Sequence, residues 1–337
     1  MRSNFFIYLL SFFVSCLVIA LFTFVYFTVF PCRGIRKTIS VNPQMNFEVE
    51  ALEKRLREHV QIFAGKIGER NLFAQQKLYE ASTTIRDFWE KEGFKVFTRT
   101  YAVNGIPSEN LWIQMDGTDL PGEIVLIGTH YDSVIGSPGA NDNASGVGAL
   151  LEISKAFRER NPPRRSLRFV AFVNEEPPFF MTNQMGSRVY AREVAKKKEK
   201  IVAMISLETI GYYTDEPRSQ KYPPFLGWFY PHRGNFVGVV GNISSQHLVK
   251  KVVQYFKAAV DFSCECLAAP RILLGVDWSD HASFWDHGYP AVMVTDTALY
   301  RYPHYHQRTD VPDHLNYPAY AKVVYGLTQV IERLANE

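Results

Sequence analysis

Apolar residues recur along the chain with the spacings of regular secondary structure. Over residues 47–64 and 72–91 they fall at steps of three and four, which places them on one face of a helix. The pattern therefore predicts two amphipathic helices, and the segments 93–101 and 110–115 that follow are expected to be strands.

From residue 123 onward, short apolar runs alternate with helical stretches. The expected strands are 124–129, 167–173, 201–207, 236–240 and 291–295. Helices are expected between them, for example at 146–160 and 246–260. Continuous apolar runs are typical of strands buried on both faces. The alternation predicts an α/β fold: a single domain with a mostly parallel central sheet covered by helices on both faces.

The first 37 residues differ from the rest of the chain. Residues 5–30 contain no charge, and Arg2 and Arg33 flank them. About 20 apolar residues span a bilayer, whereas a signal-peptide core has only about 7 to 15. We therefore expect an N-terminal transmembrane helix within 1–37, with a cleaved signal or a buried core helix as alternatives. A tether, 38–46, would lead to one domain, 47–337, membrane-anchored and extracytoplasmic (periplasmic or extracellular).

Composition narrows the possible partners. The chain has 337 residues, of which 47% are hydrophobic and 21% charged, and a net charge of +3. These values describe an ordinary folded protein, and without a basic cluster nucleic acid is not an expected partner. The pair Cys264 and Cys266 leaves open a strained disulfide, free thiols or buried packing. Nothing in the sequence indicates an oligomeric state.

Acidic residues and histidines follow the predicted strands. Those at strand ends or in the loops just beyond them are His130, Glu175, Glu176, Glu208 and His306. In an open parallel sheet the carboxyl ends of the strands form one rim, and ligands bind in the crevice there. We therefore expect these side chains to converge on a single site.

The residue types predict a metal centre. Imidazole and carboxylate ligands without thiolate suit zinc, with cobalt or manganese as possible substitutes. Asp142, in the turn "GANDNASG" before the helix at 146–160, supplies a further ligand. Five ligands can hold two metal ions if one carboxylate bridges them, and Asp142 is the expected bridge, its alternative being an ordinary helix N-cap. The predicted ligands of two zinc ions are His130, Asp142, Glu176, Glu208 and His306.

Two further acids are expected to serve the reaction. Glu175 is adjacent to a ligand but is not needed as one, so it is the predicted general base. The alternative reading of the Glu175–Glu176 pair is a solvated turn. Asp132, two residues after His130, is expected to accept the other ring N–H and fix the tautomer. For His281, a role in the pocket and a structural role both remain open.

Six segments carry a family resemblance. They are "GTHYDS", "NDNASGVGALLE", "FVNEE", "LETIGYY", "SDHASFWDHGYPAVM" and "YHQRTD". In this order they are similar to the motifs of the M28 family of zinc metallopeptidases, over roughly residues 70–335. The resemblance implies that His130, Asp142 and Glu208 hold one zinc ion, that Asp142, Glu176 and His306 hold the other, and that Glu175 is the base. The aminopeptidases of the family usually have aspartate where this chain has Glu208, so an extra methylene must be absorbed.

These features together predict a zinc-dependent exopeptidase that acts on peptides, most simply an aminopeptidase. The first side chain of the substrate is expected to enter an apolar pocket that includes Met181, Met185 and the aromatic segment 211–234. The alternatives are a carboxypeptidase, a single-zinc acyltransferase similar to the glutaminyl cyclases, and an inactive binding ectodomain. Hydrolysis leads because all five ligands and the base are present.

Overall fold

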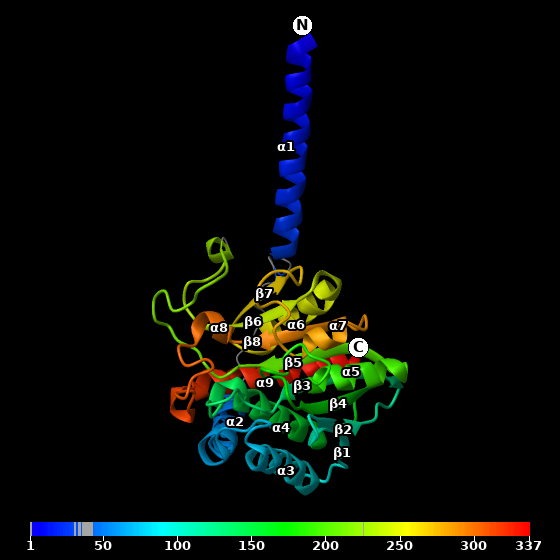
Figure 1. Ribbon diagram of the computed structural model, residues 1–337, viewed down its shortest axis with the longest axis vertical. Coiled ribbons are helices and arrows are strands. Elements are labelled where there is room, and N and C mark those ends of the chain that lie inside the picture. Colours follow the sequence, from blue (N-terminus) through cyan, green and yellow to red (C-terminus); the bar gives the residue numbers. More distant parts are fainter. Residues whose placement is uncertain (1, 30–31, 33–34, 36–42, 225) are drawn as a thin grey trace.

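A mixed β-sheet with helices on both faces forms the centre of the molecule (Figure 1). The computed structural model describes residues 2–29, 32, 35, 43–224 and 226–337. The strands of the described chain are β1 (Phe97–Val103), β2 (Ile106–Met115), β3 (Leu120–His130), β4 (Arg165–Phe172), β5 (Lys200–Glu208), β6 (Phe236–Gly241), β7 (Ser263–Ala268) and β8 (Ala291–Thr295).

The order of the strands places the predicted site residues on one rim. It runs β1-β2-β4-β3-β5-β8-β6-β7. Strands β4, β3, β5 and β8 are parallel, so their carboxyl ends lie on the same side. Antiparallel pairing joins β1 to β2, β2 to β4 and β6 to β8, whereas β6 and β7 are parallel. The predicted α/β architecture is therefore confirmed, with parallel pairing in the centre and at the β6–β7 edge.

Helices bury both faces of this sheet. Because successive side chains of a strand point to opposite faces, Val125 and Ile127 of β3 pack in one core and Ile124 and Leu126 in another. The first core lies under α2, α3, α4, α6 and α9, and the second under α5 and α7. The helices are α2 (Pro43–Val60), α3 (Gln75–Lys91), α4 (Ser145–Arg158), α5 (Gly186–Lys196), α6 (Gln246–Ala259), α7 (His281–Trp285), α8 (Ala298–Arg301) and α9 (Tyr317–Asn336).

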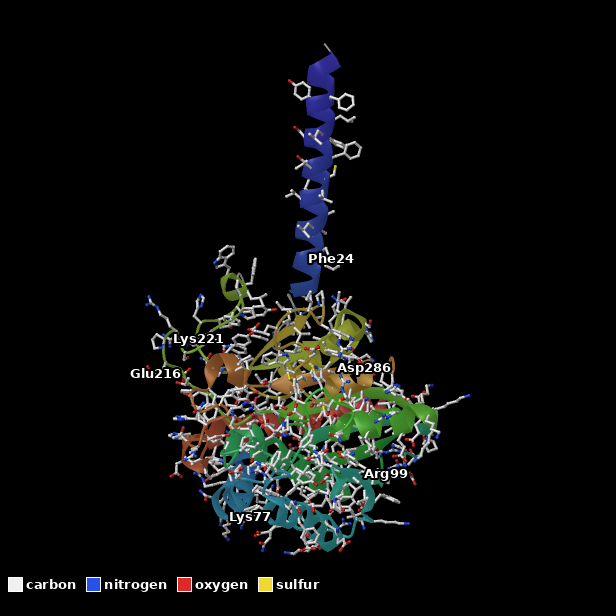
Figure 2. The ribbon with its side chains drawn as sticks, viewed as in Figure 1. Phe24, Lys77, Arg99, Glu216, Lys221 and Asp286 are labelled. Carbon is white, nitrogen blue, oxygen red and sulfur yellow. A yellow bond between two sulfur atoms is a disulfide. The ribbon has the colours of Figure 1, made fainter. Side chains whose placement is uncertain are left out.

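The N-terminal helix corrects one of our predictions. Helix α1 (Arg2–Val29) projects from the domain, and Phe24 lies toward its lower end (Figure 2). A membrane span needs about 20 consecutive apolar residues. Among the described residues, no helix combines the length and the apolar character that crossing a membrane requires. The prediction of a transmembrane anchor is therefore wrong, as is the membrane-anchored, extracytoplasmic placement that depended on it. The predicted tether, 38–46, falls largely outside the described residues, and the proposed division into segments stays a prediction.

A disulfide joins the start of the chain to the far edge of the sheet. Cys32 bonds Cys266 on β7, with 6.4 Å between their Cα atoms. Cys264 is a buried free thiol. The C-x-C pair is therefore not an internal disulfide. Cys264 and Cys266 are alternate residues on the same face of β7, and only Cys266 is bonded to a third cysteine, Cys32.

Candidate metal centre

Five separate segments deliver side chains to the carboxyl rim of the sheet. His130 ends β3 and Glu208 ends β5, while Glu175 and Glu176 follow β4 by three and four residues. The remaining two predicted ligands come from the turn before α4 and from the loop after α8. The structure brings all five predicted ligands together in two overlapping groups, His130–Asp142–Glu208 and Asp142–Glu176–His306.

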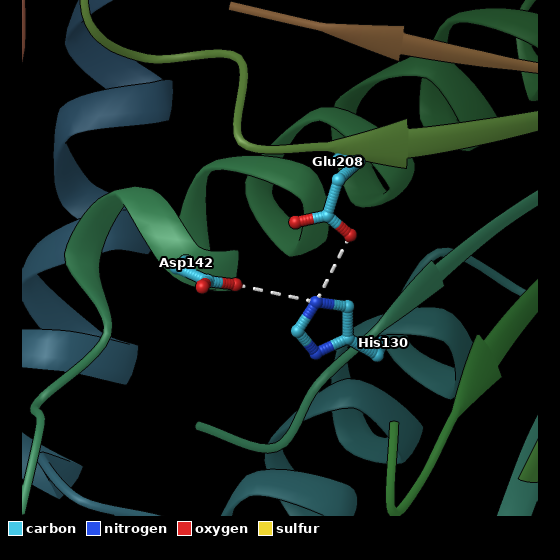
Figure 3. A group of neighbouring side chains, drawn as sticks. All are labelled: His130, Asp142 and Glu208. Carbon is cyan, nitrogen blue, oxygen red and sulfur yellow. Dashed lines mark ion pairs between the residues drawn. The ribbon is translucent and has the colours of Figure 1, made fainter. Parts of the chain in front are cut away.

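The first group surrounds the imidazole of His130 (Figure 3). Its Nε2 lies 3.3 Å from Oδ1 of Asp142 and 3.2 Å from Oε2 of Glu208. All three side chains are buried. The extra methylene of Glu208 is accommodated without loss of this approach, and Ser279 holds the carboxylate by donating a 2.9 Å hydrogen bond to Oε2.

The second group uses the other oxygen of Asp142. Nε2 of His306 lies 3.1 Å from Oδ2 of Asp142 and 3.2 Å from Oε2 of Glu176. The side chain of His306 is 30% exposed, whereas that of Asp142 is 4% exposed. The centre is therefore open to solvent on the side of His306.

Several of the candidate ligand atoms have no hydrogen-bond partner, as expected for atoms that bind a cation. Among the described side chains, buried atoms without a hydrogen-bond partner include both ring nitrogens of His130, Oδ1 of Asp142 and Oε1 of Glu176. Burying an unpaired charged group is costly unless an opposite charge compensates it. In each group the candidate ligand atoms lie within 4.8 Å of one another. Nitrogen and carboxylate oxygen are the donors that zinc takes in hydrolytic sites.

The charges of the centre act strongly on one another. Burial raises the pKa of Glu176 to about 7, and the nearby carboxylate of Asp142 adds to this. Burial also raises the pKa of Glu175 well above its ordinary value, although His130 opposes the shift. For Asp142, burial acts upward, but contacts with His130 and His306 outweigh it and lower the pKa. Several acids thus compete for few positive charges, a repulsion that a bound cation would relieve.

Asp132 supports the acids rather than the histidine ring. Its two oxygens accept the backbone N–H groups of Glu175 and Glu176, each at 3.1 Å. Its distance to Nδ1 of His130 is 3.6 Å, which is beyond a hydrogen bond. The structure therefore places Asp132 beside the ring, as expected, but its hydrogen bonds orient the segment that carries the predicted base.

Asp310 and Arg70 were missed by the sequence analysis. The carboxylate of Asp310 accepts the N–H groups of Asn141 at 2.8 Å and Asp142 at 3.1 Å, and so holds the turn that carries the shared ligand. The buried guanidinium of Arg70 donates to the carbonyls of Tyr131 and Gly139 and thereby fastens the loop between β3 and that turn. Asp310 lies in the quoted segment "YHQRTD", which was a usable signal; Arg70 stands in no motif.

His281 has a structural role. Its Nε2 lies 2.8 Å from the carbonyl oxygen of Val276, and its ring packs edge-on against Trp285. Burial lowers its pKa to about 4, so the ring is neutral near pH 7. The neighbouring Asp280 is fully buried, and its charge acts on His130. Of this pair, therefore, Asp280 rather than His281 interacts with the charges of the centre.

An apolar pocket opens beside the centre. It runs from Glu208 and Tyr305 over β8 and β6 to Glu265 on β7. Its volume is about 890 Å³, which includes the solvent-filled opening. Tyr222, Leu226 and Tyr230 line it, which confirms that the aromatic segment 211–234 contributes to a pocket. Neither Met181 nor Met185, which we expected in the pocket wall, is among the residues that line it.

Comparison with known proteins agrees with this architecture. The family model of Peptidase family M28 matches residues 110–331. This chain belongs to peptidase family M28. It is therefore a hydrolase of the peptidase type, and the family resemblance found in the sequence is confirmed.

Two curated relatives cover most of the chain. The uncharacterized protein YfbL of Escherichia coli (strain K12) is 36% identical over 291 residues, which are 84% of this chain and 87% of that protein. A probable leucine aminopeptidase of Trichophyton verrucosum (strain HKI 0517) is 25% identical over 288 residues, 77% of this chain and 70% of that protein.

Solved structures share the fold at low sequence identity. The LapA aminopeptidase of Legionella pneumophila matches with a TM-score of 0.66 and 16% identity, over 90% of this M28 chain and 78% of that one. A zinc aminopeptidase from Bacillus subtilis matches with a TM-score of 0.53 and 21% identity, over 70% and 52%. The glutaminyl cyclase of Fimbriiglobus ruber matches with a TM-score of 0.60 and 18% identity, over 83% and 94%.

Proposed function

We propose that this M28 peptidase is a zinc-dependent exopeptidase, and more specifically an aminopeptidase that removes N-terminal residues from peptides. The observation that carries the proposal is the position of Asp142, whose two oxygens face two separate groups of ligands. A carboxylate shared in this way is what a pair of metal ions about 3.5 to 4 Å apart requires. The aminopeptidase relative and the zinc aminopeptidase of similar fold support this reading.

The ligand groups assign the two ions. His130, Asp142 and Glu208 would hold one zinc ion, and Asp142, Glu176 and His306 the other. When bound, such a pair polarises the scissile carbonyl and makes water a better nucleophile. The peptide substrate would approach from the side of His306, where the centre is exposed.

Glu175 is the proposed general base. Its Oε2 lies 3.8 Å from Nε2 of His130, so the carboxylate borders the first ligand group without belonging to either group. It would take a proton from the attacking water and deliver it to the leaving amine. Asp132 holds the backbone that carries this carboxylate by accepting the N–H groups of Glu175 and Glu176.

The test separates proton transfer from metal binding. In Glu175→Gln we expect the hydrolysis of aminoacyl-4-nitroanilides to fall by about 10²- to 10⁴-fold, the usual contribution of a positioned acid or base. Metal analysis should still find two zinc ions per chain, because Glu175 is in neither ligand group. Glu159→Gln is the matched control, since Glu159 is exposed at the end of α4. Full activity of Glu175→Gln would show that another group is the base.

Acyl transfer and carboxypeptidase activity are the alternatives that the same experiment addresses. A glutaminyl cyclase of similar fold covers most of the chain, so we include a peptide with N-terminal glutamine and a peptide with a free C-terminal residue. One zinc ion per chain together with cyclisation of the glutaminyl peptide would replace the proposal with acyl transfer. Release of the C-terminal residue alone would replace it with carboxypeptidase activity.

A further inference from the structure

A single row of paired residues connects the metal centre to the far end of the apolar pocket. Glu208 on β5 pairs with Thr295 on β8, Thr295 pairs with Gly238 on β6, and Gly238 pairs with Glu265 on β7. Residues directly opposite one another in a sheet point to the same face. Glu208 and Glu265 therefore project from one face, three strand spacings or about 14 Å apart.

Between these two glutamates, the sheet surface that forms the floor of the pocket carries little side-chain volume. Gly238 contributes no side chain, and a Cβ built there would lie 3.4 Å from Thr295 and Thr297, which is ordinary contact. The pocket can therefore run without interruption from Glu208 to Glu265 along the row. A side chain larger than hydrogen at 238 would occupy part of this space.

Glu265 closes the far end of the pocket. Strand alternation directs Cys264 and Cys266 into the opposite core, so Glu265 points to the pocket side together with Leu267. Burial raises the pKa of Glu265, and Lys257 is the cation whose charge opposes that shift. Within the described part of the chain, no ion pair is formed between Lys257 and Glu265. Among the described residues, the half-buried carboxylate therefore has no bonded cation, and on the pocket side its neighbours are mainly apolar.

Two tyrosines complete this end of the pocket. The rings of Tyr222 and Tyr230 stack with their centroids 5.8 Å apart. Their hydroxyl groups donate to the carbonyls of Pro231 and Cys266, which fixes the rings in place. Aromatic faces and a carboxylate together are the groups that proteins use to bind organic cations.

We propose that this pocket selects substrates whose first residue is lysine or arginine. The methylenes of that side chain would lie against Leu226 and Leu274, and its charged end would reach Glu265 and the two tyrosines. The side chains of both glutamates reach into the interval of about 14 Å between the two strands. The space that is left suits a long side chain better than that of leucine, which would leave the half-buried carboxylate of Glu265 without a partner. The proposal rests on the proposed aminopeptidase function, because it makes the pocket the site of the N-terminal side chain.

Paired substrates test the charge separately from the length. The zinc-loaded full chain is assayed with the 4-nitroanilides of lysine and of norleucine, which has similar length but no charge. Glu265→Gln should lower the ratio of kcat/KM for lysine over norleucine by at least about tenfold and leave kcat/KM for norleucine unchanged, because the lysine ammonium exchanges a charged acceptor for a neutral one. Glu216→Gln is the control, since Glu216 is exposed on the same loop as Tyr222 (Figure 2). An unchanged ratio in Glu265→Gln, or a wild-type preference for norleucine, would overturn the proposal.

A larger side chain at position 238 and a direct measurement of ligand binding test the proposal independently. Gly238→Val should lower kcat/KM for both long substrates while the 4-nitroanilide of alanine is still cleaved. Calorimetry of L-argininamide should show at least about tenfold weaker binding to Glu265→Gln than to the wild type. If no 4-nitroanilide is cleaved but this difference in binding is found, the exopeptidase proposal fails and the cation pocket stands. Equal binding to both proteins would overturn the cation pocket whatever the activity.

Discussion

Asp310 holds the backbone of Asp142, the ligand shared by both groups, from the same loop that supplies one of the histidines. Its Oδ2 accepts the N–H of Asp142 at 3.1 Å, and His306 lies four residues earlier in the chain. The hydroxyl of Tyr302 donates to the other oxygen at 2.8 Å, which fixes the carboxylate of Asp310. One loop after α8 therefore both delivers a ligand and positions the turn that carries another.

The shared position of Asp142 predicts unequal effects of ligand substitutions on metal content. In Asp142→Asn both groups lose a charged ligand, so we expect less than one tightly bound zinc ion per chain. In His306→Ala only the second group is broken, so one ion should remain with His130, Asp142 and Glu208. Metal analysis after gel filtration measures both stoichiometries. Equal loss in the two variants would contradict separate groups that share one acid.

Asp132 is predicted to affect turnover more than metal content. In Asp132→Ala the N–H groups of Glu175 and Glu176 lose their acceptor, so the base and its neighbour should be less well oriented. We expect kcat to fall by about 10- to 100-fold, the usual effect of removing a group that orients catalytic side chains. Steady-state kinetics and metal analysis measure the two effects, with Asp313→Asn, an exposed substitution, as the control. Loss of zinc with little change in kcat per bound ion would instead assign Asp132 to the support of His130.

Glu152 is predicted to make stability depend on pH. Its buried carboxylate accepts a 2.6 Å hydrogen bond from Nε of Arg55, and its other oxygen lies 2.8 Å from Nε2 of His59. Burial acts upward on the pKa of Glu152, but contacts with His59 and Arg55 outweigh it and lower the pKa. The unfolded chain therefore binds this proton more readily, so the contribution to stability is present above about pH 4.3 and is lost as the pH falls through the lower folded value.

Urea denaturation of Glu152→Gln measures this contribution. At pH 7 we expect the free energy of unfolding to fall by about 1 to 3 kcal/mol, because the substitution weakens hydrogen bonds to a buried charged group. The difference from the wild type should shrink when the pH is lowered toward 3.5. Glu159→Gln, exposed at the end of the same helix, should show almost no difference at either pH. A difference that stays constant between the two pH values would rule out the charge of Glu152 as its origin.

The polar rim was predictable because local patterns determined it. Short apolar runs marked the central strands, and acids or histidines directly beyond them could only lie at their carboxyl ends. His130 and Glu208 end neighbouring strands, so the pattern alone predicted both on this rim, whereas their assignment to one ligand group came from the resemblance to the M28 motifs. The two helices before the sheet followed from their apolar spacing in the same way.

Features that depend on distant contacts were not predictable. Strand β7 alternates buried and partly exposed residues at the edge of the sheet, so it lacks the continuous apolar run of the central strands. Cys266 bonds Cys32 rather than its near neighbour, because tertiary packing brings together residues far apart in sequence. Arg70 lies in no motif, yet its buried guanidinium fastens the loop before Asp142. The prediction for the N-terminal segment was wrong because the length of a charge-free run and its flanking charges were taken to indicate a membrane span.

The bond between Cys32 and Cys266 also shapes the denatured ensemble. It closes a ring in which the paired cysteines are 234 residues apart, and this ring contains β1 to β6 and the first part of β7. By the chain-entropy model, a closure of this length removes conformational freedom from the denatured state equivalent to about 5 kcal/mol. The oxidised chain thus begins refolding with β7, an edge strand of the sheet, already tied to the segment that precedes the domain, whereas the reduced chain must bring these two segments together by diffusion.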